Sequence, residues 1–293
     1  MSTDAATRPI IDTHQHLWVI SERRYDWIVP ETGPLYADFR PEDVAADAVA
    51  LGVTGCVLVQ AADTYDDTFF MMSVAESDPR VVGVVGWVPL DRTEEAATAL
   101  RLYAASGIVK GIRAPTHTYD DERWILRDPA APALRVLADL GLTLDLVVTS
   151  VEQLRIVDEL AAQHPDLTIV LDHLASPPIA TQGWNPWAEA FAAVARHPNV
   201  ATKLSGLSTC STPETWTVDD WRRYVYHALA VFGSHRMMVG SDWPVAVLNG
   251  GYRRAMEAVR AIGESLSVEQ RDDLYFRTAH RLYGVPLPAG VPL

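Results

Sequence analysis

The chain has 293 residues, 48% of them hydrophobic, so a compact fold can bury about three quarters of the surface that the unfolded chain exposes. It carries 24 Lys and Arg against 38 Asp and Glu, a net charge of −14, which argues against nucleic acid or an anionic membrane as its main partner. The composition argues against a disordered chain.

The two cysteines, Cys56 and Cys210, lie far apart in the sequence, so they predict neither a disulfide framework nor a cysteine zinc site. The amino-terminal stretch lacks the basic segment followed by an apolar segment that marks a secretion signal. No run of about 18 apolar residues is present. From these features we expect a cytoplasmic protein.

Short β-branched runs alternate with longer amphipathic stretches from end to end, which is the pattern of repeated βα units on a parallel sheet. The predicted strands cover residues 9–18, 53–60, 81–89, 107–113, 142–148, 167–173, 200–206 and 237–243. Eight such units most simply close into an α/β fold of the (β/α)8 TIM-barrel type, possibly distorted. An open doubly wound sheet is the second choice, but a glycine-rich phosphate turn does not follow the first strand. Since no linker divides the chain, we predict one domain over residues 1–293.

Charged and polar residues interrupt the apolar strands, mostly near the carboxyl ends. A buried charge costs several kcal/mol unless it is paired or ligated, so a scaffold alone would not favour these residues. In a barrel these ends form the active-site face. The residues are Asp12, His14, His16, Lys110, Arg113, Asp145, Asp172, His173, Lys203 and Asp242.

His14 and His16 are two residues apart on the first predicted strand, so both imidazoles face the same side, toward the barrel axis. This is a metal-ligand spacing, although an H-x-H pair by itself is also common as a structural pair. His173 and Asp242 end the sixth and eighth predicted strands, and together the four residues point to one site.

The motifs DTHQH, LDH and GSDWP resemble those of the amidohydrolase superfamily. The finer set HLW, YDW, VKGIR, LDHLASP, KLSGL and MVGSDWPV is similar to its branch of sugar-lactone and muconolactone hydrolases, which includes L-fuconolactonase and L-rhamnonolactonase types. The resemblance spans nearly the whole chain. It implies a hydrolase that opens a lactone ring, with a small-molecule lactone as its partner.

The same resemblance places His14, His16, His173 and Asp242 around the reacting group. Binuclear members need a carboxylated Lys or a Glu on the fourth strand and a His on the fifth, whereas this chain has Lys110 or Arg113 and then Asp145. The implied cofactor is therefore either none or one divalent metal, with zinc preferred. If a metal is bound, His14, His16 and Asp242 are its ligands; otherwise they contact the substrate carbonyl.

For the reaction we expect Asp242 to act as general base on the water that attacks the lactone carbonyl, and His173 to hold the carbonyl oxygen or the metal. Arg113 and Lys110 are further catalytic candidates, but their opposite strand parity means that both face the site only if the strand ends or bulges between them. Lys110 can instead form a salt bridge inside or behind the barrel. Lys203 is assigned to substrate binding, or else pairs with a buried carboxylate.

Aromatic residues in the loops after the strands can pack against the C–H faces of a sugar ring, although burial in the core is their commoner use. The substrate contacts that we expect are Trp18, Trp27, Trp243 and, in a loop, His117.

The preferred substrate is a neutral sugar aldonolactone such as L-fucono- or L-rhamnonolactone, used in carbohydrate catabolism. A carboxylated lactone stays open because Arg24, Arg123 and Arg127 could bind it. A metal-dependent decarboxylase of an unsaturated or aromatic acid is the alternative enzyme, since it shares the histidine and aspartate set. A barrel that binds a ligand without turnover is the third alternative.

Overall fold

The computed structural model describes residues 8–114 and 121–291. Its eight strands are all parallel and follow one another around the sheet in chain order, so the fold is a (β/α)8 barrel and the predicted fold class is confirmed. The doubly wound alternative is wrong because the order of the described strands runs from β1 to β8 without the reversal that such a sheet has. The strands are β1 Ile10–Gln15, β2 Val53–Val59, β3 Val81–Gly86, β4 Val109–Ala114, β5 Thr143–Leu146, β6 Ile169–Leu171, β7 Val200–Leu204 and β8 Met237–Val239.

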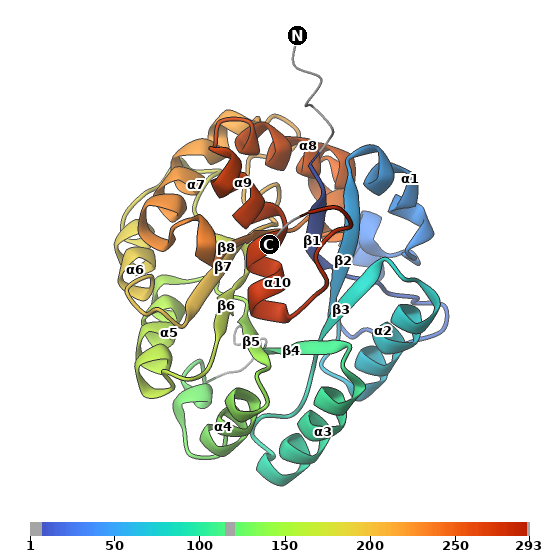
Figure 1. Cartoon of the computed structure of the whole chain (residues 1–293), viewed down its shortest axis with the longest axis vertical. Coiled ribbons are helices and arrows are strands. Elements are labelled where there is room, and N and C mark those ends of the chain that lie inside the picture. Colours follow the sequence, from blue (N-terminus) through green and yellow to red (C-terminus); the bar gives the residue numbers. More distant parts are fainter. Residues whose placement is uncertain (1–7, 115–120, 292–293) are drawn as a thin grey trace.

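Helices surround the barrel as an outer ring (Figure 1). The ring is formed by α1 Glu42–Ala50, α2 Tyr65–Ser77, α3 Thr93–Ser106, α4 Ala131–Asp139, α5 Val151–Gln163, α6 Trp187–Val194, α7 Val218–Phe232 and α8 Gly251–Gly263; α9 Val268–Asp272 and α10 Thr278–Tyr283 follow them. Several begin at a capping side chain; Ser150, for example, accepts the N–H of Gln153 at the start of α5. Helix α3 ends on Gly107, whose φ of 72° is the left-handed conformation that glycine adopts without strain. In the described residues no helix is long and apolar enough to cross a membrane.

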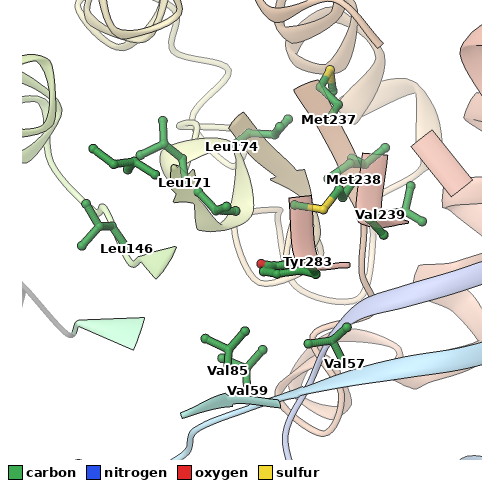
Figure 2. Packing of buried hydrophobic residues seen from close by; sticks show 14 of the residues in the cluster. Val57, Val59, Val85, Leu146, Leu171, Leu174, Met237, Met238, Val239 and Tyr283 are labelled. Carbon is green, nitrogen blue, oxygen red and sulfur yellow. The ribbon is translucent and has the colours of Figure 1, made fainter. Parts of the chain in front are cut away.

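Apolar side chains from successive strands are buried and pack on the two faces of the barrel wall (Figure 2). Val57, Val59, Val85, Leu171 and Val239 are each at most 1% exposed. Such a core is packed and is no pore, so ligand access is left to the ends of the barrel.

The seam between β1 and β8 closes the barrel without a regular strand ladder in the described residues. The hydroxyl of Thr13 donates to the carbonyl of Val239 at 2.8 Å. Beyond the end of β8, the N–H of Asp242 donates to the carbonyl of His14 at 2.8 Å. In the other direction, the N–H of His16 donates to the carbonyl of Trp243 at 2.6 Å. The seam is therefore held together by the same residues that the sequence assigns to the site.

Helix α10 lies across the opposite, amino-terminal opening of the barrel, near its centre in Figure 1. The hydroxyl of Thr278 at its first residue donates to the carbonyl of Ser234, which precedes β8. The last residue of the helix, Tyr283, is 3% exposed and lies against the apolar core (Figure 2). The amino-terminal end is thus closed, and the carboxyl ends of the strands are left for a site.

Seven of the eight predicted strands, all except 107–113, continue further than the observed ones; β6 and β8, for example, end at Leu171 and Val239. The reason is that the backbone turns sharply where the polar residues begin. His173 has φ 54° and Asp242 has φ 59°, both in the left-handed region that side-chain-bearing residues seldom adopt. Such conformations cost about 1–3 kcal/mol each and cluster at functional sites.

Candidate active site

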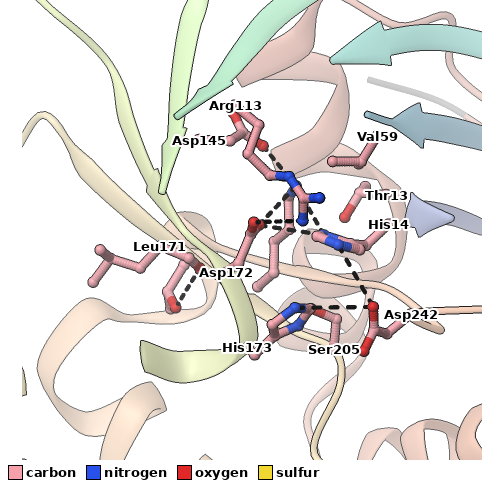
Figure 3. Close-up of polar contacts among 12 residues, drawn as sticks. Thr13, His14, Val59, Arg113, Asp145, Leu171, Asp172, His173, Ser205 and Asp242 are labelled. Atoms are coloured by element: carbon pink, nitrogen blue, oxygen red, sulfur yellow. Dashed lines mark hydrogen bonds and ion pairs between the residues drawn. The ribbon is translucent and has the colours of Figure 1, made fainter. Parts of the chain in front are cut away.

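A cavity of about 620 Å³ opens at the carboxyl ends of the strands. It is lined by residues from the loops after β1, β2, β5, β6, β7 and β8, and by Arg113 on β4. The lining residues are His16, Arg24, Asp26, Trp27, Gln60, Ala61, Ala62, Asp63, Thr64, Arg113, Val147, Thr149, His173, Ser176, Thr209, Cys210, Asp242 and Val245. Figure 3 shows the polar side chains at its floor.

His14 and His16 point to the same place, as the strand spacing predicts. Their Nε2 atoms lie 3.2 Å apart. His16 is oriented by a 2.7 Å contact between its Nδ1 and the carbonyl of Val59, and a carbonyl oxygen can only accept. His16 therefore carries its proton on Nδ1 and presents the Nε2 lone pair to the site. Burial lowers the pKa of both rings, that of His14 well below its ordinary value, so both are neutral imidazoles that can act as ligands.

The carboxylate of Asp242 lies at the centre of the histidines. Its Oδ1 is 3.7 Å from His14 Nε2, 3.5 Å from His16 Nε2 and 3.9 Å from His173 Nε2. Burial by itself raises the pKa of a carboxyl, but the electrostatic interactions with the nearby His173, His16 and His14 more than offset it and bring the pKa of Asp242 to about 2. Asp242 is thus ionised at neutral pH.

His173 and Asp172 lie on a short turn, Asp172–Ala175, directly after β6. The residues from His173 through Ser176 all have positive φ, which turns the His173 ring into the cavity while Asp172 stays fully buried. His173 Nδ1 contacts the hydroxyl of Ser205 at 2.8 Å, and this contact holds the ring orientation. Asp172 Oδ1 lies 3.2 Å from His14 Nδ1 and so supports the far side of that ring.

His14, His16 and Asp242 fit a single divalent cation. One ligand atom of each lies within 4.8 Å of the others, and the measured separations are 3.2, 3.5 and 3.7 Å. Ligand atoms around a tetrahedral zinc, with bonds of about 2.0–2.1 Å, lie roughly 3.3 Å apart. Two neutral imidazoles and an ionised carboxylate are also the donors that zinc prefers.

Arg113 and Lys110 are separated by the structure. Arg113 reaches the cavity, where its Nη2 donates to the carbonyl of Gln60 at 2.5 Å and its Nη1 lies 4.0 Å from Asp172 Oδ2. Lys110 instead donates to the carbonyl of Gly107 at 2.8 Å, in the turn before β4, at the amino end of the strand. The structure therefore does not bring Lys110 to the site, because the two residues lie at opposite ends of one strand with opposite parity.

Lys203 is fully buried beneath the cavity and is not among the described residues that line it. Its ammonium lies 2.6 Å from Asp145 Oδ2 and 3.1 Å from Asp172 Oδ1. Lys203 therefore forms the ion pair with a buried carboxylate that the sequence offered as the alternative to substrate binding. This geometry does not support a direct contact between Lys203 and the substrate.

The aromatic candidates divide in the same way. Trp27 lines the cavity, is 43% exposed and donates from its indole to the carbonyl of Ala61 at 2.7 Å. Trp18 is completely buried and packs edge-on against Trp27, with ring centres 5.4 Å apart. Trp243 is 3% exposed and packs against Phe39. Trp18 and Trp243 therefore support the loops from behind. His117 lies outside the described residues.

The arginines weighed for acidic substrates are mostly engaged elsewhere. Arg24 lies at the cavity rim and pairs with Asp26 at 2.5 Å, both side chains being at least 80% exposed. Arg123 pairs with Glu159, and Arg127 pairs with Asp121. Neither of these two lines the described part of the cavity.

Sequence reasoning missed the polar residues that follow β2. Gln60 and Asp63 both line the cavity, and the amide of Gln60 donates to Asp63 Oδ1 at 3.0 Å. Thr149 and Thr209 are two further lining residues. The available signal was position, because Gln60 and Asp63 directly follow a predicted strand and so lie at the active-site face of a barrel.

Comparisons with known proteins agree with this geometry. Residues 11–285 match the family described as Amidohydrolase. A Burkholderia ambifaria protein named L-fucono-1,5-lactonase is 36% identical over 83% of this chain and 82% of its own length. A Burkholderia multivorans protein of the same name is 31% identical over 97% of this chain and 98% of its own length.

Among solved structures, an amidohydrolase from Burkholderia multivorans with bound zinc superposes with a TM-score of 0.85 at 30% identity, over 95% of this chain and 100% of that one. The family match covers both the first strand, which carries the histidine pair, and Asp242. This chain is a member of the amidohydrolase family.

Proposed function

We propose that the protein hydrolyses a neutral sugar lactone of the L-fucono-1,5-lactone type to its hydroxy acid. The observation that carries this is the ionised Asp242 carboxylate, surrounded by three imidazoles at the floor of a cavity. The two relatives named as L-fucono-1,5-lactonases support the substrate class.

The cavity suits a hydroxylated ring. Asp63 offers carboxylate oxygens to ring hydroxyls, and the partly exposed face of Trp27 offers an apolar surface for ring C–H groups. Asp26, Asp63 and Asp242 place three carboxylates in the described lining against the two guanidinium groups of Arg24 and Arg113. This balance disfavours a substrate that already bears carboxylates.

In the reaction, Asp242 accepts a proton from a water held between its carboxylate and His173. The water oxygen attacks the lactone carbonyl carbon, and the negative charge that develops on the carbonyl oxygen is stabilised by the Arg113 guanidinium. When the tetrahedral intermediate collapses, the bond between that carbon and the ring oxygen breaks. The proton held by Asp242 passes to the departing ring oxygen, which gives the open hydroxy acid and restores the carboxylate.

Amidohydrolases usually use a divalent metal, and we propose zinc for this chain, held by His14, His16 and Asp242. Such an ion would polarise the carbonyl and lower the pKa of a bound water toward neutrality. The zinc-bound relative structure supports the choice of metal. We further propose that residues 1–293 act as one domain; the cytoplasmic location stays a prediction.

The proposal is tested by following acid release from a panel of lactones, with a pH indicator, before and after treatment with chelator. The panel contains L-fucono-1,5-lactone, an unsubstituted δ-lactone and a dicarboxylated pyrone lactone. We expect the sugar lactone to give the highest kcat/KM, and zinc to restore any activity that the chelator removes. A preparation that opens none of the lactones at a rate above the spontaneous one contradicts the proposal.

The metal-dependent decarboxylase is less favoured, since the curated relatives at 31–36% identity carry the lactonase name. Carbon dioxide release from unsaturated and aromatic carboxylic acids, measured on the same preparation, separates the two activities.

A further inference from the structure

A buried chain of polar groups runs through the barrel from helix α10 to the site. It begins at Tyr283, which enters the barrel from the amino-terminal opening, and its phenol donates to Asp145 Oδ2 at 2.5 Å. Lys203 donates to the same oxygen at 2.6 Å and also lies 3.1 Å from Asp172 Oδ1. Asp172 in turn lies 3.2 Å from His14 Nδ1. The chain thus links the carboxyl-terminal helix to a residue at the cavity floor.

The buried charges in this chain do not balance by themselves. Asp145 and Asp172 bring two carboxylates, while Lys203 brings one ammonium, and all three are fully buried. The ammonium also contacts His14 Nδ1 at 3.3 Å, so its position decides how that ring is held. Two carboxylates therefore compete for one cation directly behind His14.

Neutral donors relieve this competition at Asp145. The hydroxyl of Thr143 donates to Oδ1 at 2.7 Å, while the phenol of Tyr283 donates to Oδ2, the oxygen that Lys203 also binds. Burial raises the pKa of Tyr283 well above its ordinary value, so the phenol keeps its proton and stays a donor. With two neutral donors on Asp145, the ammonium can stay between Asp145 and Asp172.

We propose that Tyr283 is a positioning residue for the active site: its hydrogen bond to Asp145 leaves Lys203 free to hold Asp172 against His14. Without the phenol, Asp145 Oδ2 draws the ammonium toward itself and away from Asp172. The support behind His14 then loosens, and the ring no longer keeps its orientation toward Asp242. A helix at one end of the barrel thereby sets the geometry of the site at the other end.

The test compares Tyr283→Phe with a matched control, Tyr252→Phe. Tyr252 is also buried, at 4% exposure, but its hydroxyl has no hydrogen-bond partner within residues 8–114 and 121–291. Because changes behind a metal-binding histidine cost about tenfold or more in metal affinity or activity, we expect kcat of Tyr283→Phe to fall by roughly tenfold. KM changes by less than about twofold, since Tyr283 does not line the described cavity. Tyr252→Phe keeps the kcat of the parent protein.

A second readout does not need turnover. The kinetic comparison rests on the proposed lactonase function, whereas the ring nitrogen shifts of histidine-labelled protein report the tautomer and contacts of His14 directly. The His14 signals are assigned by their loss in His14→Gln. We expect Tyr283→Phe to shift both His14 nitrogens and Tyr252→Phe to leave them in place. If no lactone is hydrolysed, the proposed function fails while this comparison still decides the role of Tyr283.

Should Tyr283→Phe not accumulate as folded protein, Thr143→Val carries the test, because it removes the other neutral donor to Asp145 and leaves α10 unchanged. The same fall in kcat and the same displacement of the His14 signals are expected. A folded Tyr283→Phe or Thr143→Val protein whose His14 signals match those of the parent protein overturns the proposal.

Discussion

Gly206 lies directly against the imidazole of His173: a β-carbon added at Gly206 would be 2.5 Å from His173 Nδ1 and 2.9 Å from Asp242 Oδ2. With φ at +61°, the position also favours glycine for its backbone. The glycine in KLSGL thus makes room for two site residues at once.

The first prediction concerns this glycine. We expect Gly206→Ala to reduce kcat/KM by at least about tenfold. The added methyl group must displace His173 from Asp242, and a small misplacement of catalytic groups lowers the reaction rate strongly. The control is Gly107→Ala, which has a similar φ of +72° but nothing within 4 Å of the added carbon. Both variants are expected to lose about 1–2 kcal/mol of unfolding free energy from left-handed strain. Equal kcat/KM in the two would contradict the interpretation.

The second prediction concerns Asp242. Asp242→Asn keeps the size of the side chain but removes the proton acceptor, so we expect kcat to fall by about 10²–10⁴ while circular dichroism stays unchanged. Metal content measured on the same preparation distinguishes a lost ligand from a lost base. Near-normal turnover in the variant would remove Asp242 from the mechanism.

The third prediction concerns substrate choice. Asp63→Asn weakens the acceptor for ring hydroxyls, so we expect KM for L-fucono-1,5-lactone to rise by roughly tenfold, the value of one charge-assisted hydrogen bond. An unsubstituted δ-lactone lacks those hydroxyls and its kcat/KM is expected to stay within about twofold. Asp26→Asn, at the cavity rim, is the matched control. An equal loss of kcat/KM on both lactones would mean that Asp63 does not bind the ring hydroxyls.

The fourth prediction is a pH dependence of stability from Asp67, which is 2% exposed and accepts the N–H of Ala61 and of Ala62. Burial outweighs these hydrogen bonds and raises the pKa of Asp67 from 3.8 to about 6 in the folded protein. The folded state therefore holds the proton more tightly than the unfolded state. The stabilisation is full below pH 3.8 and is lost as the pH rises through about 6.

The amide in Asp67→Asn does not titrate. The difference in unfolding free energy between the parent protein and this variant therefore reports the titration of Asp67 separately from that of all other carboxyls. We expect the unfolding free energy of the parent, relative to that of the variant, to decrease by roughly 2 kcal/mol between pH 4 and pH 7.5. Urea unfolding at a series of pH values measures it. A difference that rises with pH would reverse the assigned direction.

Much of the fold follows from the sequence because each strand is a short β-branched run bounded by helix caps and stops. His14, His16, His173 and Asp242 could be brought together for the same reason, since the ends of parallel strands in a barrel meet on one face. The left-handed backbone conformations of His173 and Asp242 could not be predicted, because tertiary packing imposes them against local preference.

The direction of individual side chains follows less directly from the sequence than the positions of the strands. The pairing of β1 with β2 shifts register between Asp12 and Gln15, so strict alternation does not hold along that strand. Lys203 and Trp243 are adjacent to site motifs in sequence, yet neither lines the described cavity: Lys203 is buried inside the barrel beneath it, and Trp243 packs against Phe39. Tyr283 gave no signal, since its partner Asp145 is 138 residues away in the sequence.

The seam between β1 and β8 has a consequence for inactivation by heat. Its closing hydrogen bonds involve His14, His16 and Asp242, and in the described residues it lacks the ladder that joins the other neighbouring strands. Local opening there costs less free energy than global unfolding. Catalysis is therefore expected to cease a few degrees before the helical signal melts, and the amide protons of His16 and Asp242 to exchange with solvent ahead of those in β4 and β5.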